Sequence, residues 1–236
     1  MARVLVTRPE PGASATARRL VAAGHQPVVL PLSEIHALSP ELPSAGTVDI
    51  VAATSANALR HLPPVPAALL GRPCYTVGAR TAEEARRAGF TDVRAADGDG
   101  AALAAMIVAT ERGGTTVLYL CGRVRRPEFE RSLEQAGIAV HPVEIYDTRF
   151  LEPGLTAINH AAGGRPIDAV LLYSAETARV MASIIAAGDP ANLFAEASLL
   201  CLSAQVAAAL ETLGSARTYV PMVPTEDGLL ALVPRG

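Results

Sequence analysis

Residues 49–59 read DIVAATSANAL, and residues 168–178 read DAVLLYSAETA. Each stretch begins with an aspartate, continues as a short apolar run, and reaches a serine–alanine pair followed by residues that favour a helix. A continuously apolar strand that leads directly into a helix is typical of a parallel sheet with helices on both faces. The two stretches therefore predict an α/β fold that contains this strand–helix junction twice.

The repeat extends beyond these stretches. Three further pairs of segments match: Leu20–Gly24 with Leu133–Gly137, Val77–Ala79 with Leu202–Ala204, and Asp99–Gly100 with Asp227–Gly228. The L-x-x-A-G pair lies on opposite sides of the other matches in the two copies, so the repeat is cyclically permuted. Two similar α/β domains, one of them discontinuous, explain this order.

We therefore expect two parallel-sheet domains of flavodoxin or Rossmann-like type. Residues 1–33 and 155–236 would form the discontinuous domain and residues 48–146 the other, with interdomain linkers at 34–47 and 147–154. These linker ranges contain the proline and glycine residues that suit connections between domains. In such an arrangement the cleft between the domains is the expected ligand site.

Composition excludes several classes of function. The net charge of −3 over 236 residues does not favour nucleic-acid binding, and no apolar run is long enough to span a membrane. All basic residues are arginine, which excludes a lysine Schiff base and a Walker-A NTPase. The cysteines and histidines lack metal-ligand spacing, so we expect no metal site and a protein of the reducing cytoplasm.

Seven motifs follow one another along the chain: VLVTRPEPG (4–12), ATSANAL (53–59), YTVGART (75–81), LYLCGR (118–123), GIAVHPVEIYDT (137–148), LLYSAETA (171–178) and CLSAQVAAAL (201–210). Their order and spacing resemble the uroporphyrinogen-III synthase family, from Val4 to Leu232. The resemblance implies a monomeric lyase without cofactor. Its substrate would be hydroxymethylbilane, a linear tetrapyrrole that the enzyme closes with inversion of the last pyrrole, ring D, releasing water.

A substrate with eight carboxylates, as the resemblance implies, needs anion donors. The N–H groups at a helix start bind carboxylates, and small residues begin a helix at four strand–helix junctions. The residues expected to bind substrate there are Ser55, Ala56, Gly78, Ser174, Ala175 and Ser203. The alternative is that these residues are ordinary helix caps.

Further candidates come from the same regions. Asn57 and Thr81 resemble substrate-facing positions of the family, or are solvated residues of a first helical turn. Two equivalent strand ends carry Thr7-Arg8 and Gly122-Arg123, where each arginine could bind a carboxylate or simply be solvated. Three other arginines are expected to be solvated on a helix face: Arg80, Arg125 and Arg126.

Tyr146 matches the tyrosine that the family places near the leaving hydroxyl. A phenol can donate a proton or a hydrogen bond to that oxygen. The alternative is a linker tyrosine packed where the domains meet. Because the bilane also closes unaided, without inversion, loss of this phenol should weaken the activity and not abolish it.

Two other functions fit part of the pattern. Two permuted α/β domains also describe hinge-closing proteins that bind small molecules without catalysis, although these are normally exported. A nucleotide-dependent transferase is the third reading, but Thr7–Gly12 lacks the G-x-G-x-x-G fingerprint. The sequence predicts no nucleic-acid or membrane partner and leaves open a transient contact with the preceding enzyme of the pathway.

Overall fold

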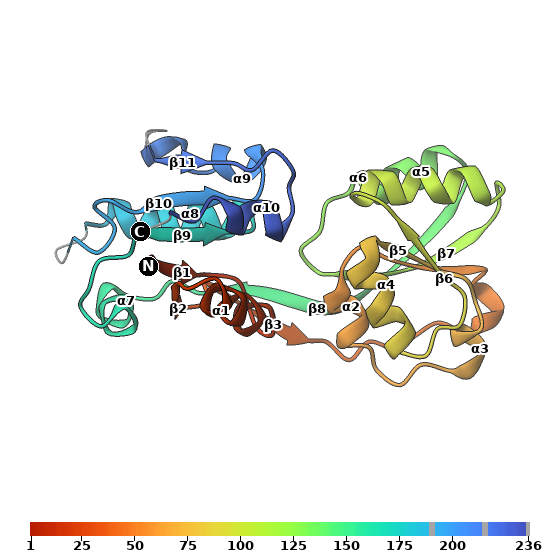
Figure 1. Cartoon of the computed structure of the whole chain (residues 1–236). Coiled ribbons are helices and arrows are strands. Elements are labelled where there is room, and N and C mark those ends of the chain that lie inside the picture. Colours follow the sequence, from red (N-terminus) through yellow and green to blue (C-terminus); the bar gives the residue numbers. More distant parts are fainter. Residues whose placement is uncertain (189–191, 214–216, 235–236) are drawn as a thin grey trace. The chain divides into compact units, whose positions relative to one another are not determined.

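The computed structural model describes residues 1–188, 192–213 and 217–234, and the remaining residues all lie within the range 155–236. The chain divides into two compact units (Figure 1). Unit 1 comprises Met1–Glu34 and Arg149–Gly236, and unit 2 comprises Ile35–Thr148. The chain ends therefore both belong to unit 1, and unit 2 is one continuous segment.

Unit 1 is built on a parallel sheet with strand order β11-β10-β9-β1-β2. The strands are β1 (Arg3–Val6), β2 (Gln26–Val29), β9 (Ala169–Leu172), β10 (Ser198–Cys201) and β11 (Thr218–Tyr219). One face packs against α7 (Leu155–Ala162), α8 (Ala175–Ala186) and α9 (Ala204–Ala208). The other packs against α1 (Gly12–Ala22) and α10 (Glu226–Ala231), and a short 3-10 helix, η2, covers Glu211–Leu213.

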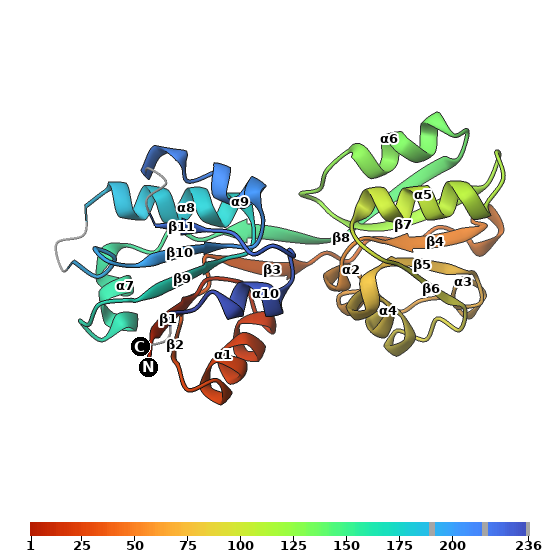
Figure 2. The ribbon, with the colours of Figure 1, turned by 45° about the horizontal axis from the view of Figure 1, so that its top comes forward.

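Unit 2 contains most of a sheet with strand order β3-β8-β7-β4-β5-β6. The strands are β3 (Ser33–Ala37), β4 (Ile50–Ala53), β5 (Cys74–Val77), β6 (Val93–Ala96), β7 (Thr116–Gly122) and β8 (Ala139–Phe150). Helices α5 (Gly100–Thr110) and α6 (Glu128–Gln135) cover one face (Figure 2). The opposite face packs against α2 (Ala56–Arg60), α3 (Ala67–Leu70) and α4 (Gly78–Arg87).

The two sheets share one strand order. The sequence β11-β10-β9-β1-β2 of unit 1 corresponds strand by strand to β6-β5-β4-β7-β8 of unit 2. Along the chain, however, unit 2 runs from β4 to β8 without a break, whereas unit 1 begins with β1 and β2 and resumes with β9. This is the permuted repeat that the sequence predicts, and the α/β fold class with two parallel-sheet units is confirmed.

The segments expected as linkers contain regular structure. Range 34–47 holds most of β3 and a 3-10 helix, η1 (Ala45–Thr47). Range 147–154 begins inside β8, which continues to Phe150. Strand β8 is rich in β-branched and aromatic residues, which favour extended structure even where the chain passes from one unit to the other.

Strand β7 divides the core of unit 2 into two layers, because alternate side chains point to opposite faces of a strand. Leu118 and Leu120 pack with the α2–α4 layer, whereas Tyr119 and Cys121 pack with the α5–α6 layer. Burial raises the pKa of the Cys121 thiol to about 12, so this group packs as a neutral side chain. Among the described residues, no helix has both the length and the apolar character needed to cross a membrane.

Candidate functional site

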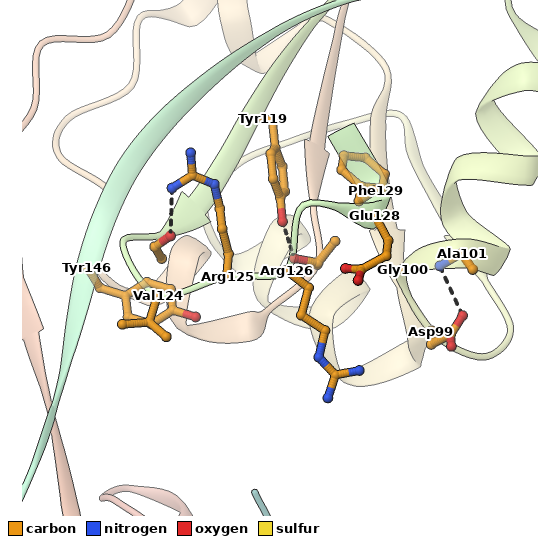
Figure 3. Close-up of a pocket in the computed structure, with 12 residues that line it drawn as sticks. Asp99, Gly100, Ala101, Tyr119, Val124, Arg125, Arg126, Glu128, Phe129 and Tyr146 are labelled. Carbon is orange, nitrogen blue, oxygen red and sulfur yellow. Dashed lines mark hydrogen bonds between the residues drawn. The ribbon is translucent and has the colours of Figure 1, made fainter. Parts of the chain in front are cut away.

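A pocket of about 380 Å³ lies within unit 2, at the edge of the sheet where the parallel strands end (Figure 3). This edge is where ligands bind in open α/β sheets. The ends of β4 and β7, a residue of β8 and the starts of α5 and α6 supply its walls. The lining residues are Thr54, Asp99, Gly100, Ala101, Tyr119, Gly122, Val124, Arg125, Arg126, Glu128, Phe129 and Tyr146.

Tyr146 reaches the pocket because of an irregularity in β8. Cys121 of β7 pairs with Glu144, but Gly122 pairs with Tyr146, so Ile145 is an extra residue in the ladder. Such a bulge redirects the side chains that follow it. Ile145 and Tyr146 are consequently both buried in the same core layer, at 0% and 9% exposure, although they are neighbours in a strand.

Gly122 provides the space for the Tyr146 ring. A methyl group added at Gly122 would lie 2.6 Å from Cζ of Tyr146 and 2.9 Å from its hydroxyl oxygen, closer than such atoms approach one another. Burial raises the pKa of Tyr146, and the nearby Ser55 side chain partly opposes that rise. The structure therefore brings together three residues that the sequence singled out: Ser55, Gly122 and Tyr146.

A second tyrosine, Tyr119, has only its hydroxyl end at the pocket. Its ring packs against Phe129 with 4.6 Å between ring centroids, and its hydroxyl oxygen lies 2.8 Å from Oγ1 of Thr54. Burial raises the pKa of Tyr119 to about 12. The phenol of Tyr119 is therefore neutral across the neutral range.

Charged side chains also line the pocket, from Arg125, Arg126 and Glu128. Arg125 donates to Glu130 over 2.6 Å and to Glu144 over 3.1 Å, and its side chain is 23% exposed. The expectation of a solvated Arg125 was therefore wrong, because two carboxylates hold it against the protein. Arg123 also donates to Glu144, and this bond is the main reason that the pKa of Glu144 lies below its usual range.

The other predicted site residues of unit 2 lie at the end of a strand or shortly after it. Ser55 caps α2 by accepting a hydrogen bond from the N–H of Asn57 over 3.2 Å, and Ala56 is buried. Gly78 begins α4 with a positive φ of 67°, which favours glycine. Thr81 is buried in α4, so the alternative that it is a solvated residue of the first helical turn was wrong.

The predicted residues of unit 1 occupy the equivalent edge of its own sheet. Ser174 caps α8 by accepting from the N–H of Thr177 over 3.2 Å, and Ala175 is the first residue of that helix. Ser203 precedes α9 without a side-chain capping bond. Thr7 is fully buried and donates its hydroxyl to the Leu171 carbonyl over 2.6 Å, so this hydroxyl ties β1 to β9.

Arg8 is held by partners from its own unit. Its guanidinium lies 3.2 Å from a carboxylate oxygen of Glu226 and 4.3 Å from the centre of the Tyr173 ring. Glu226 also pairs with Arg19 and accepts a hydrogen bond from the Thr16 hydroxyl. A substrate carboxylate would have to displace Glu226 in order to reach Arg8 in this arrangement.

Reasoning from the sequence missed Tyr119 and Phe129 as pocket residues. It marked Asp99 as part of the repeat but assigned it no place in the site; the structure shows its carboxylate capping α5 by accepting from the N–H groups of Ala101 and Ala102. A signal for Tyr119 was present in the motif LYLCGR, because a polar hydroxyl inside an otherwise apolar strand requires a partner when buried.

Comparison with known proteins agrees with the fold and the motifs. The family model described as Uroporphyrinogen-III synthase HemD matches residues 14–231. A uroporphyrinogen-III synthase of Saccharomyces cerevisiae is 36% identical over 103 residues, which are 40% of this chain and 38% of the yeast protein. The matched stretch thus spans less than half of that relative.

Two solved structures are similar along almost the whole chain. The uroporphyrinogen-III synthetase of Helicobacter pylori has a TM-score of 0.65 at 17% identity and covers 98% of each chain. A mutant uroporphyrinogen III synthase of Thermus thermophilus has a TM-score of 0.57 at 19% identity, covering 98% of this chain and 96% of the other. Similarity at these identities establishes the fold, and the match of the family model establishes kinship. The chain belongs to the uroporphyrinogen-III synthase family.

Proposed function

We propose that this chain is a lyase that closes hydroxymethylbilane with inversion of ring D, giving uroporphyrinogen III and water. The observation that carries this proposal is the placement of Tyr146, which lies against Gly122 at a pocket of unit 2. This is the tyrosine that the family resemblance associates with the leaving hydroxyl. The family match supports the same conclusion.

The chemistry requires a proton at one stage and its removal at another. Tyr146 would donate a proton, or a hydrogen bond, to the leaving hydroxyl, which departs as water and leaves a cationic azafulvene. The ring D carbon that carries the bridge to ring C attacks this azafulvene carbon and forms a spiro intermediate. The bond from ring D to the ring C bridge then breaks and leaves a second azafulvene on ring C. The free carbon of ring D attacks this second azafulvene and loses its proton, which closes the ring with ring D inverted. The protein's main task is to hold the bilane in the geometry that leads to inversion, because closure without inversion occurs unaided.

The donors at the strand–helix junctions would bind carboxylate side chains of the substrate. Ser55, Ala56 and Asn57 begin α2, and Gly78 begins α4, so main-chain N–H groups face this edge of unit 2. Ser174, Ala175 and Ser203 provide the corresponding edge in unit 1. Arg123, which is 54% exposed, is a further candidate for a carboxylate. Thr7 and Arg8 are weaker candidates for binding a carboxylate. The Thr7 hydroxyl already donates to the Leu171 carbonyl, and Arg8 already pairs with Glu226.

The family resemblance implies an enzyme without a cofactor, and the proposed reaction needs none.

We place the protein in the cytoplasm on the evidence of its three free cysteines, which are all buried: Cys74, Cys121 and Cys201.

The proposal is tested by incubating the protein with freshly generated hydroxymethylbilane and separating the oxidised products by chromatography. The expected result is isomer III in excess over the isomer I that forms without the protein. Formation of isomer I alone, at the rate seen in buffer, would overturn the proposed function.

Tyr146→Phe is expected to lower the rate of isomer III formation about tenfold, the effect of losing one hydrogen bond to the leaving hydroxyl, without abolishing it. The reason is that phenylalanine keeps the ring that fills the space over Gly122 and loses only the hydroxyl. The measurement is the initial rate of isomer III formation beside the isomer ratio. A wild-type rate in this variant would remove Tyr146 from the role of donor.

The pH dependence follows from the raised pKa of Tyr146. A phenol is the donor in its protonated form, and a raised pKa keeps that form at higher pH. The part of the rate that Tyr146→Phe removes should therefore stay constant from neutral pH upward and decline only above about pH 10, the ordinary phenol value. Subtracting the variant's pH profile from that of the wild type measures this part, and a decline centred near pH 8 would contradict the assignment.

A further inference from the structure

Tyr119 and Thr54 form a hydroxyl pair that links two strands at the edge of unit 2. Tyr119 lies on β7, and Thr54 follows the last residue of β4. Their hydroxyl oxygens are 2.8 Å apart. Because Tyr119 is only 2% exposed and packs against Phe129, its ring is fixed and its hydroxyl offers Thr54 a partner at a defined position.

Thr54 directly precedes Ser55, whose side chain accepts a hydrogen bond from the N–H of Asn57 over 3.2 Å. Thr54, Tyr119 and Tyr146 line the same pocket, and Ser55 lies near enough to Tyr146 to lower the pKa of its phenol. The conformation of the turn at Thr54 and Ser55 therefore sets the surroundings of the Tyr146 hydroxyl.

The internal repeat shows that the fold does not require a phenol at position 119. Ser55 corresponds to Ser174, so Ala52 of β4 corresponds to Leu171 of β9. Ala52 pairs with Tyr119, and Leu171 pairs with Val6. Unit 1 thus builds the same strand with a fully buried valine where unit 2 has Tyr119.

We propose that Tyr119 is a positioning residue for the Tyr146 site, which acts by holding the turn of Thr54 and Ser55 through the 2.8 Å hydroxyl contact. This inference rests on the proposed function. It adds a residue that acts through the turn of Thr54 and Ser55 and not as a proton donor. Its effect should therefore appear in the rate of the inverting closure and in the environment of Tyr146.

The chain offers a matched control in Tyr75. Ala52 pairs with Tyr75 on its other side, and both tyrosines are buried in the same core layer. The Tyr75 hydroxyl donates instead to Glu111, at the opposite edge of the sheet. Tyr75→Phe therefore removes the hydroxyl of a buried tyrosine that pairs with the same residue, Ala52, as Tyr119 does, and it leaves the turn at Thr54 unchanged.

The experiment compares Tyr119→Phe, Thr54→Val and the double variant with Tyr75→Phe. Each single variant of the pair should lower kcat for isomer III about fivefold, the value expected for one lost hydrogen bond, with KM little changed. The double variant should be no slower than the slower single variant, since both remove the same contact. Thr54→Ser keeps the hydroxyl and should restore most of the rate, and Tyr75→Phe should match the wild type.

A second readout does not depend on turnover. With tyrosine labelled at Cζ with carbon-13, the Tyr146 resonance, assigned from its loss in Tyr146→Phe, should shift in Tyr119→Phe and Thr54→Val but not in Tyr75→Phe. If Tyr119→Phe leaves both the Tyr146 resonance and kcat at their wild-type values, the positioning role is wrong. The proposed function would still stand in that case, as long as the wild-type protein forms isomer III. If the wild type forms no isomer III, the proposed function fails, and this inference fails with it.

Discussion

Replacing Gly122 with alanine is expected to lower the rate of isomer III formation about 100-fold, more than the loss of the Tyr146 hydroxyl alone. The added methyl group would lie 2.6 Å from Cζ of Tyr146, so the ring has to move. A displacement of about 1 Å in a reacting group can cost about two orders of magnitude in rate. The substitution also narrows the pocket that Gly122 lines.

The backbone itself should accept this change. The backbone φ of Gly122 is not positive, so an alanine at this position is not strained by a left-handed conformation. Gly113→Ala is the control, because a methyl group at Gly113 would meet no atom within 4 Å and this glycine also lacks a positive φ. Steady-state rates of isomer III formation measure the effect, and circular dichroism confirms folding. A folded Gly122→Ala protein with more than half of the wild-type rate would contradict the assigned role of the Tyr146 ring.

Leu118→Ala is expected to lower the free energy of unfolding of unit 2 by about 2–5 kcal/mol, the range for leucine truncations in a packed core. Leu118 is 1% exposed on the central strand β7, where it packs with Val51, Leu59 and Leu69. Alanine would leave a cavity between the sheet and the helices of that face.

Native-state hydrogen exchange read by mass spectrometry measures this loss separately for each unit. Peptides from β4 and β7 should lose protection, whereas peptides from β9 and β10 in unit 1 should keep theirs. Val108→Ala is the control, because Val108 is 41% exposed on α5 and should change stability by no more than about 0.5 kcal/mol. A loss below 1 kcal/mol in Leu118→Ala, on the order expected for a surface site, would show that this layer is not the close-packed core described.

The strand–helix junctions could be predicted from the sequence because their causes are local. An apolar run buried in a parallel sheet, a serine that caps the next helix, and a glycine after the helix are all visible within about ten residues. Ser55 and Ser174 were identified in this way, and both cap the helices that follow them. The permuted order of these junctions along the chain was visible for the same reason, whereas the order of the strands within each sheet came from the structure.

The arrangement of side chains at the site could not be read in the same way, because it depends on contacts between distant segments. Arg8 was expected either to bind a substrate carboxylate or to be solvated, but Glu226, near the other end of the chain, lies beside it. Tyr146 was identified by resemblance, whereas its orientation depends on the bulge at Ile145, which no local pattern marks. Strand β3 was also missed, because its residues are partly polar and its neighbour in the sheet, β8, follows much later in the chain.

The continuity of unit 2 has a consequence for synthesis on the ribosome. All residues of unit 2, Ile35–Thr148, leave the exit tunnel before the first residue of β9, the strand that lies between β1 and β10 in unit 1. Strand β1 can pair with β2 but must remain without its other sheet partner, β9, while the whole of unit 2 is made. We expect unit 2, with its Tyr146 pocket, to fold before β1 pairs with β9, so that the middle of the nascent chain folds before unit 1 is complete.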